Sequence, residues 1–213
     1  MIFETRCAGC DTPGGAICTV CRFALLGRAP RHHDGHDGGV IAALAFTGRA
    51  RDVVIGLKYR NRRAVGRHLA GLVVNRVVET GAHQGLDVVT WAPTSPRRRR
   101  ERGFDQGELL ARTVARQLGL PCRRLLERDT GPSQTGRSRA ERLRGPRFRA
   151  RPELGGRRVL VVDDVVTTGA TLQAAGAALA SRGAEPVLAA VAATPERRPA
   201  NVVELRARRS HAA

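Results

Sequence analysis

The sequence predicts an α/β fold built on a mostly parallel β-sheet. Apolar runs rich in Val, Leu and Ala have the length of buried strands, and they lie at residues 40–46, 86–91, 159–162 and 187–193. Segments in which apolar residues recur at helical spacing separate these runs, at residues 51–59, 64–80, 101–118 and 171–182. Strands that alternate with helices favour a parallel sheet, because each crossover helix returns the chain to the end of the sheet where the previous strand began.

Turn and helix-stop residues set the ends of these elements. Gly81 follows an expected helix at the position where glycine commonly ends one. Pro93 ends the second strand, and we expect the basic segment after it, at residues 94–100, to be a loop. Residues 127–152 contain few apolar side chains and are expected to form a long mobile loop with a short extended piece near Phe148.

Composition divides the chain into four parts. Its 213 residues are enough for one good core and a small appendage. A Cys-rich segment occupies residues 1–30, and a polar linker that contains glycines follows at residues 31–39. The α/β domain is expected to span residues 40–195, and residues 196–213 form a tail without clear periodicity.

The chain is strongly basic, because 37 Lys and Arg residues against 19 Asp and Glu residues give a net charge of +18. A positive field concentrates polyanions such as nucleic acid, nucleotides and pyrophosphate near the surface. Coding bias is the alternative, since Lys58 is the only lysine, but bias explains Arg in place of Lys better than it explains the excess of positive charge. Aromatic residues make up only 3%, which argues against a nucleic-acid surface built on base stacking.

Two further patterns bear on location. The chain has no run of about 18 apolar residues, so we expect no membrane span. The first residues, MIFETRCAGC, lack the apolar core of a secretory signal, which favours a cytoplasmic protein. Thiols stay reduced in the cytoplasm, where structural disulfides are rare.

Four cysteines in two Cys-x-x-Cys pairs predict a metal site near the N-terminus. Cys7 and Cys10 form the first pair, and Cys18 and Cys21 form the second, with seven residues between the pairs. Each pair places two thiolates on one turn, and two such turns complete a tetrahedral zinc site. Disulfides and redox-active thiols are the alternatives. Because all four ligands would come from the protein, the zinc is expected to be structural.

The segment Val159–Thr171, VLVVDDVVTTGAT, predicts a phosphate site. It ends a buried strand, turns and opens a helix, and ligands of open α/β sheets bind at the carboxyl ends of the strands. Small side chains, hydroxyls and backbone N–H groups at the start of a helix suit a phosphate dianion. Asp163 and Asp164 can accept hydrogen bonds from ribose hydroxyls and hold Mg²⁺ through water. A capped strand-to-helix turn without a ligand is the alternative.

This segment resembles the motif that binds 5-phosphoribosyl-1-diphosphate (PRPP) in type I phosphoribosyltransferases, where four aliphatic residues, two acidic residues and a phosphate turn follow one another. The resemblance implies a type I phosphoribosyltransferase-like fold and PRPP bound together with Mg²⁺. It implies catalytic and ribose-binding roles for Asp163 and Asp164. The 5′-phosphate would lie on the turn formed by Thr167, Thr168, Gly169, Ala170 and Thr171.

Two basic segments and the cysteine pairs extend the resemblance to the ComF family. Residues 91–111, WAPTSPRRRRERGFDQGELLA, are similar to a ComF segment in which a proline-containing loop precedes basic residues and RGFNQ. Residues 133–145, SQTGRSRAERLRG, are similar to the family's QSGLSRKER, and LKYR at residues 57–60 completes the match. Asp105 stands where Asn is usual, and Ala140 where Lys is common. ComF proteins are linked to DNA uptake in natural competence and are described as phosphoribosyltransferase-like, with a zinc finger.

The family resemblance implies roles for the basic segments. The pyrophosphate loop would contain Pro93, Thr94, Ser95 and Arg97. A diphosphate or a DNA backbone would be neutralised by Arg97, Arg98, Arg99, Arg100 and Arg102. A flexible hood over PRPP would contain Gln134, Arg137, Ser138, Arg139 and Arg142. The alternatives are a solvated charged surface for the arginines and a disordered spacer for the hood.

These observations leave two functions open. In the first, a ComF-like protein binds PRPP with Mg²⁺, or a phosphoribosyl nucleotide, and also binds single-stranded DNA during DNA uptake or processing. The family resemblance implies a DNA-uptake helicase as a partner in that case. In the second, an active phosphoribosyltransferase of nucleotide salvage transfers the phosphoribosyl group to an acceptor that the sequence does not identify.

Overall fold

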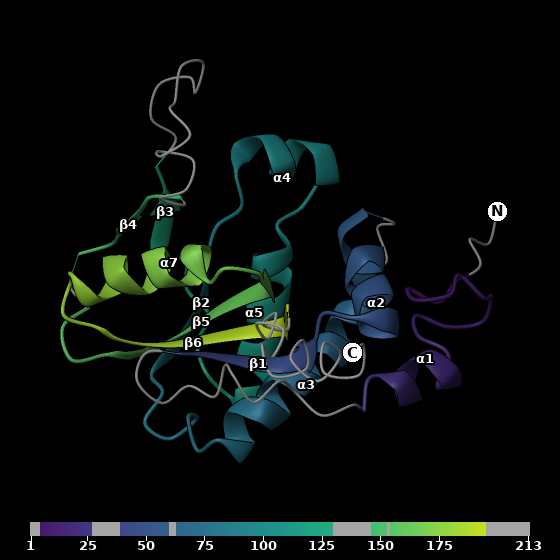
Figure 1. The fold of residues 1–213 in the computed structure, drawn as a ribbon. Helices are drawn as coiled ribbons and strands as arrows, with labels where there is room; N and C mark the ends of the chain where they lie inside the picture. Colours follow the sequence, from purple (N-terminus) through teal and green to yellow (C-terminus); the bar gives the residue numbers. More distant parts are fainter. Residues whose placement is uncertain (1–4, 27–38, 60–62, 130–145, 153, 195–213) are drawn as a thin grey trace, which may run out of the picture.

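Four parallel strands form the central sheet of the computed structural model, in the order β1-β6-β5-β2 (Figure 1). They are Val40–Ala45 (β1), Val88–Trp91 (β2), Arg158–Val166 (β5) and Glu185–Ala193 (β6). The structure describes residues 5–26, 39–59, 63–129, 146–152 and 154–194. Each of the four apolar runs forms a strand, and the prediction of a parallel α/β sheet is confirmed.

The strand β5 is longer than the sequence analysis predicted. The expected strand ended at Val162, but the parallel pairing with β6 continues to Val166, which lies opposite Ala193. The β-branched residues that follow the acidic pair extend the strand, because they pack well on a pleated surface. Asp163 and Asp164 therefore lie within the last part of the strand, where the ladder fixes their backbone.

One face of the sheet is covered by two helices. These are α3 (Gly66–Glu79), which follows a short 3₁₀ turn at Arg63–Val65, and α5 (Gln106–Leu118). Leu69 of α3 and Leu110 of α5 are fully buried in the apolar core that these helices share with the sheet. Figure 1 shows this layer on the side opposite to α7.

The other face is covered by α7 (Ala170–Ala180) and a small hairpin. The hairpin pairs β3 (Leu126–Arg128) with β4 (Phe148–Ala150) in antiparallel fashion. Leu126 and Leu172 are buried in a second apolar core on this face. The extended piece expected near Phe148 is thus a strand of this hairpin.

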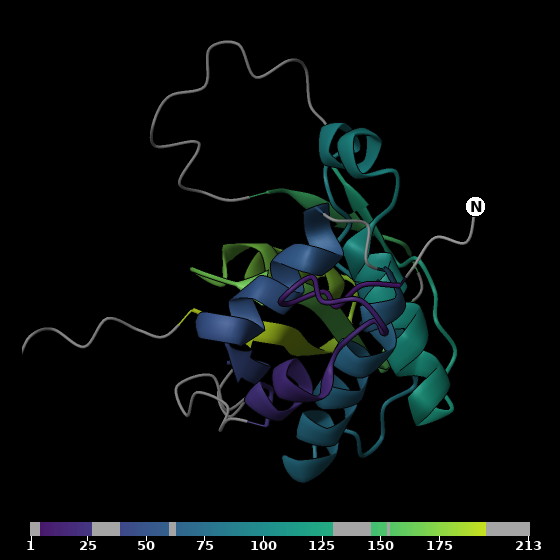
Figure 2. The same ribbon diagram turned by 90° about the vertical axis from the view of Figure 1, so that its right-hand side faces the viewer.

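The N-terminal cysteine segment packs against α2 (Gly48–Tyr59), as Figure 2 shows. Gly56 of α2 lies so close to Ala8 that a Cβ atom at position 56 would overlap the Ala8 carbonyl oxygen. Cys21 and Val53 are fully buried in the same core as Ala8. The segment therefore shares its apolar core with the sheet and α2.

Residues 96–100 of the basic segment after β2 form a helix, so the expectation of a loop at residues 94–100 was wrong except at Thr94 and Ser95. The helix α4 spans Pro96–Arg102. The Ser95 hydroxyl accepts a hydrogen bond from the Arg98 N–H at 3.3 Å, and a proline occupies the first helical position. Both features start helices, and arginine is a good helix former, so the signal for α4 was present in the sequence.

The helix expected at residues 101–118 is divided in two. Gly103 ends α4 with a φ of 74°, in the left-handed region that glycine adopts without strain. Asp105 then starts α5, because its side chain accepts a hydrogen bond from the Glu108 N–H. The segment therefore forms two separate helices, and both contribute residues to the site.

Several sequence-based expectations lie outside the described residues. They concern the linker up to residue 38, the tail at 196–213, and the hood residues Gln134, Arg137, Ser138, Arg139 and Arg142. Among the ranges that the structure does describe, no helix is both long and apolar enough to cross a membrane.

Candidate functional site

The carboxyl end of β5 leads into the phosphate turn that the sequence predicted. The chain passes through Thr167 and Thr168 to Gly169, whose φ is 76°. The helix α7 then begins at Ala170, and Gly169 has no side chain with which to cap it. The first N–H groups of this 11-residue helix lie beside the exposed hydroxyls of the turn, and that of Ala170 donates to Thr168 Oγ1 at 3.4 Å. An anion would need N–H and hydroxyl donors of this kind.

The two aspartates of β5 have different surroundings, as the alternation of side chains along a strand requires. Asp164 is buried and forms an ion pair with Lys58, with 2.9 Å between Nζ and Oδ1. The Asp163 Oδ1 atom accepts a hydrogen bond from the Asp164 backbone N–H at 2.7 Å. Burial, and then the negative charge of Asp164, raise the pKa of Asp163, while Lys58 opposes the shift. One carboxylate is therefore held by a cation, and the other gains a proton easily.

Lys58 is a site residue that the sequence analysis missed. It lies in the last turn of α2, and its side chain is only 16% exposed. The helix that packs against the cysteine segment thus supplies the partner of Asp164. The sequence did contain one signal for Lys58: it is the only lysine in a chain whose other basic side chains of this kind are all arginine.

A cavity of about 340 Å³ opens at this end of the sheet, and we call it the edge cavity. Its walls contain the aspartate pair and the hydroxyls of Thr167 and Thr171. Four cations also line it: Lys58, Arg98, Arg102 and Arg128. A cavity with a phosphate turn on one wall and several cations on the others suits a ligand that has more than one phosphate group.

Gln106, the first residue of α5, also lines the edge cavity and was missed. Its Oε1 atom accepts a hydrogen bond from Arg102 Nη1 at 2.8 Å. Its Nε2 atom is buried and has no hydrogen-bond partner among the described residues, although the residue is only 2% exposed. A buried donor without an acceptor costs about 1–3 kcal/mol, and a ligand oxygen in the cavity would remove that cost.

The predicted pyrophosphate loop lies beside the edge cavity, but its residues face different directions. Pro93 and Thr94 line the cavity. Ser95 caps α4. Arg97 is exposed and forms an ion pair with Glu101, with 2.8 Å between Nε and Oε1. The structure therefore brings only part of the predicted loop to the cavity.

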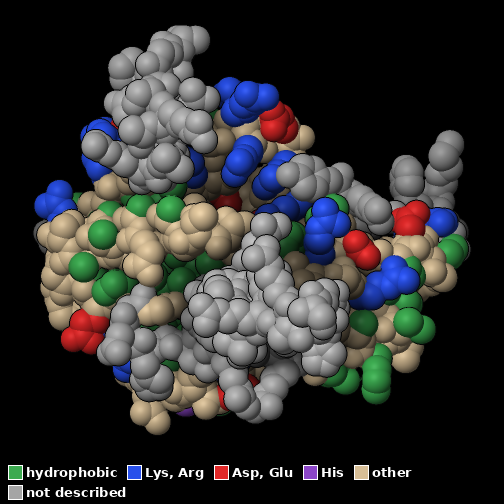
Figure 3. Space-filling view, in the orientation of Figure 1, with side chains coloured by type: hydrophobic (Ala, Val, Ile, Leu, Met, Phe, Trp, Pro, Cys, Tyr) green, Lys and Arg blue, Asp and Glu red, His purple; other side chains and the backbone are tan. Residues whose placement is uncertain are grey.

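The remaining arginines of α4 divide between two cavities and solvent. Arg98 and Arg102 line the edge cavity. Arg99 lines a neighbouring cavity behind the pyrophosphate loop. Arg100 lines neither cavity and is exposed. Figure 3 shows Lys and Arg side chains gathered over α4, so this end of the molecule presents a basic surface.

Asp105 ties the pyrophosphate loop to α5. Its Oδ2 atom accepts a hydrogen bond from the Thr94 N–H at 3.0 Å, while Oδ1 accepts one from the Glu108 N–H at 3.4 Å. The residue is 8% exposed, and burial raises the pKa of its carboxyl group. Each carboxylate oxygen of Asp105 accepts a hydrogen bond from one backbone N–H, whereas the side-chain amide of an Asn has only one acceptor oxygen.

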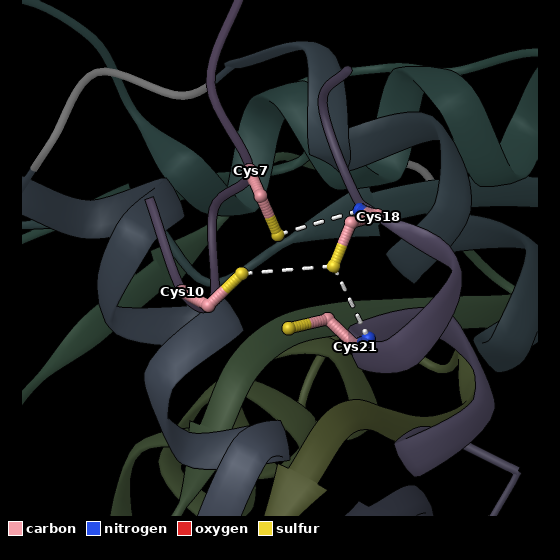
Figure 4. Close-up of side chains that lie close together, drawn as sticks. All are labelled: Cys7, Cys10, Cys18 and Cys21. Carbon is pink, nitrogen blue, oxygen red and sulfur yellow. Dashed lines mark hydrogen bonds between the residues drawn. The ribbon is translucent and has the colours of Figure 1, made fainter. Parts of the chain in front are cut away.

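The four cysteines converge, as Figure 4 shows, and their Sγ atoms all lie within 4.8 Å of one another. A tetrahedral zinc ion with Zn–S bonds of about 2.3 Å places its sulfurs about 3.8 Å apart. The Sγ atoms of Cys10 and Cys18 are 3.6 Å apart, and all four thiols are free. The Cys18 N–H donates to Cys7 Sγ at 3.4 Å, and the Cys21 N–H donates to Cys18 Sγ at 3.5 Å, just inside the short helix α1 (Thr19–Ala24). The cluster can hold a metal ion.

Residues 105–208 match the family described as the phosphoribosyl transferase domain. The match includes β5, the phosphate turn and α7. The chain is therefore similar to phosphoribosyltransferase domains over this range. Its parallel sheet flanked by helices is the type I fold that the sequence predicted, with the cysteine cluster added at the N-terminus.

Related proteins carry the name DNA utilization protein YhgH. The protein from Salmonella typhi is 28% identical over 189 residues, which are 85% of this chain and 80% of the relative. The protein from Escherichia coli strain K12 is 30% identical over 138 residues, or 62% of this chain and 61% of the relative. With the cysteine cluster, these relatives confirm the resemblance to the ComF family.

The chain is also similar to solved structures of low sequence identity. An adenine phosphoribosyltransferase is 19% identical with a TM-score of 0.44, covering 65% of this chain and 75% of that one. The glutamine PRPP amidotransferase from Bacillus subtilis, in complex with ADP and GMP, is 22% identical with a TM-score of 0.43. That similarity covers 61% of this chain and 26% of the amidotransferase.

Proposed function

We propose that the phosphoribosyltransferase domain binds PRPP together with Mg²⁺ in the edge cavity. One observation carries the proposal: the cavity unites the phosphate turn before α7, the aspartate pair of β5 and four cations. PRPP contains a 5′-phosphate, ribose hydroxyls and a diphosphate. Each of these groups has a chemically matched partner on the wall of the cavity.

The 5′-phosphate would accept hydrogen bonds from the turn between Thr167 and Thr171. The ribose hydroxyls would donate to the carboxylates of Asp163 and Asp164, which are also oxygen ligands of the kind that Mg²⁺ prefers. The diphosphate would contact the arginines that line the cavity, Arg98, Arg102 and Arg128. When bound with the diphosphate, Mg²⁺ would offset its charge and stabilise pyrophosphate as a leaving group.

Replacing the aspartate pair tests this site. Asp163→Asn with Asp164→Asn should lower PRPP affinity about 100-fold, because two carboxylate hydrogen bonds to the ribose are removed at about 1.5 kcal/mol each. Calorimetry with Mg²⁺ and PRPP measures the affinity, and the metal content of the cysteine cluster should not change. The pair Asp52→Asn and Glu79→Gln alters the charge equally and lies outside the cavity. Equal affinity in the wild type and the aspartate variant would contradict the proposal.

We further propose that the metal in the cysteine cluster is structural zinc. The four sulfurs leave no open coordination position, and the segment is packed against α2. Removal of the metal, verified by elemental analysis, should lower the thermal stability and increase hydrogen exchange in residues 5–26. Unchanged stability after complete removal would count against a structural role.

A role with single-stranded DNA, in DNA uptake or processing, is supported by the basic surface over α4, the net charge of +18 and the name of the relatives. Replacing Arg97 to Arg100 by Ala should weaken strand binding and flatten its salt dependence, by about 0.7 in slope for each phosphate that the protein no longer neutralises. The matched control replaces four exposed arginines elsewhere, namely Arg22, Arg67, Arg116 and Arg182. An unchanged slope would exclude α4 as the DNA-binding surface. A DNA-uptake helicase as partner stays a prediction of the family resemblance.

Transfer of the phosphoribosyl group in nucleotide salvage is the alternative function. The aspartate pair and the phosphate turn are both intact, which favours a competent PRPP site. A pyrophosphate-release assay with Mg²⁺ and PRPP, run against a panel of bases and with DNA as a competitor, separates transfer from binding alone. Release that depends on one base would support the enzyme, whereas binding without release would support the DNA-handling role.

A further inference from the structure

A second cavity of about 340 Å³ lies behind the pyrophosphate loop, and we call it the back cavity. It shares Pro93, Thr94, Asp105 and Arg128 with the edge cavity, so only the loop and its supports separate the two. Four arginines from different parts of the chain line it: Arg99 of α4, Arg112 of α5, Arg124 before β3 and Arg128 of β3. The proposed PRPP site does not use the first three.

The cations of the back cavity exceed its anions. Its two carboxyl groups belong to Asp105 and Glu108. Glu108 is occupied by Arg112, with 2.8 Å between Oε1 and Nη2, and Asp105 accepts two backbone N–H groups. Among the described residues, Arg99, Arg124 and Arg128 therefore have no carboxylate partner. Three arginines that line one cavity and form no ion pair with a described carboxylate favour an anionic ligand.

Arg128 is the least exposed of the four arginines that line the back cavity. Its Nη1 atom donates to the Pro93 carbonyl oxygen at 3.3 Å, and its guanidinium lies 5.7 Å from the centre of the Phe148 ring. Burial, and then the charge of Arg98, lower the pKa of Arg128, while the carboxyl groups of Asp163 and Asp105 oppose the shift. Neither carboxyl group forms an ion pair with Arg128, so an anion in either adjoining cavity would further stabilise the partly buried guanidinium.

The rest of the back cavity is apolar and indicates the size and kind of ligand. Trp91, which is 4% exposed, forms part of the wall with Pro93 and Pro96. A volume of about 340 Å³ lies at the lower end of the range for small-molecule sites. We propose that the back cavity binds the phosphate ester of one nucleotide unit, supplied either by a free mononucleotide or by a nucleic-acid strand. The apolar wall would contact the nucleoside, and Arg99, Arg124 and Arg128 would bind the phosphate.

Trp91 gives this proposal a specific test, because it is the only tryptophan in the chain and lines the back cavity but not the edge cavity. Its fluorescence should change on titration with AMP, with or without saturating Mg²⁺ and PRPP. Arg124→Ala should weaken AMP binding about tenfold, and Arg99→Ala should weaken it to a similar degree. Arg123→Ala is the matched control, because it removes the same charge at the neighbouring position. Arg123 is exposed and lines neither cavity.

The same titration with a short oligothymidylate distinguishes the two sources of phosphate. A response to both ligands supports the site for free nucleotides and strands alike, and a response to the strand alone identifies nucleic acid as the source. Equal AMP affinity in Arg124→Ala, Arg99→Ala and the wild type would overturn the proposal. So would displacement of AMP by PRPP, which would place the nucleotide in the edge cavity. If calorimetry finds no PRPP binding, the proposed function fails, while the titration with AMP alone still decides the back cavity.

Discussion

Replacement of Lys58 by Met should destabilise the protein, because it leaves the Asp164 carboxylate buried without its cation. Met nearly preserves the length and apolar stem of the side chain, so the change mainly removes charge. Lys58 Nζ and Asp164 Oδ1 are 2.9 Å apart, and the two side chains are 16% and 12% exposed. Breaking a fully buried pair costs about 3–5 kcal/mol, and partial exposure lowers the expected cost to about 2–3 kcal/mol.

The thermal assay for this prediction has a built-in control. For a chain of this size, about 2–3 kcal/mol corresponds to a decrease in Tm of about 5–10 °C. Circular dichroism should be recorded for Lys58→Met, for Asp164→Asn and for the double variant. The double variant should be less destabilised than the sum of the single changes, because it leaves no unpaired charge. A Tm for Lys58→Met within about 1 °C of the wild type, or strict additivity, would refute the reasoning.

Three further predictions concern other contacts. Gly56→Ala should cost about 1–3 kcal/mol and weaken metal binding, because its Cβ would overlap the Ala8 carbonyl; Gly71→Ala is the control, since its Cβ would meet only Gln117 Oε1 at 3.7 Å, and equal stability of the two variants would contradict the close packing. Asp163→Asn should flatten the pH dependence of stability. The Asp163 carboxyl group has a pKa of about 8 in the folded protein and about 4 in the unfolded chain, so the stability of the wild type falls as the pH rises between these values. The variant lacks this carboxyl group and should not show that decrease. Stability is measured by urea denaturation at several pH values. The same dependence of stability on pH in the wild type and in Asp163→Asn would argue against the raised pKa. Asp105→Ala should cost about 1–2 kcal/mol and speed hydrogen exchange at the Thr94 N–H, whereas unchanged exchange there would show that Asp105 does not hold the loop.

The sequence predicted the features that depend on local pattern. The buried runs became the four strands, since continuous β-branched and aliphatic residues suit strands covered on both faces. The strand, turn and helix of residues 159–171 and the cysteine cluster were predicted because their residues are neighbours in the chain. The helix α4 was missed although Ser95 and Pro96 signal a helix start, because the run of arginines was interpreted as a solvated loop.

The rest of the site depends on contacts between distant segments. Lys58 and Asp164 meet only because α2 leaves the end of β1 and crosses toward β5. Arg128 reaches the pyrophosphate loop from the hairpin on the other face of the sheet. The Gln106 amide becomes informative only in the structure, where its Nε2 atom is buried and no described residue accepts a hydrogen bond from it. A single sequence gives no register between such segments, so periodicity could not have revealed them.

The contact between the cysteine segment and α2 also bears on the order in which the chain assembles. Within the described part of the chain, the edge strand β1 pairs only with β6, the last of the strands there, so β1 has no such partner until residues 185–193 have been synthesised. Unpaired strands of this kind invite association with other chains. Ala8, Gly56 and Val53 meet much earlier, because all of them precede the second strand. With the proposed metal bound, a newly made N-terminal segment would therefore bury the apolar side of α2 before β1 is paired, and the supply of metal during synthesis would affect how much protein folds.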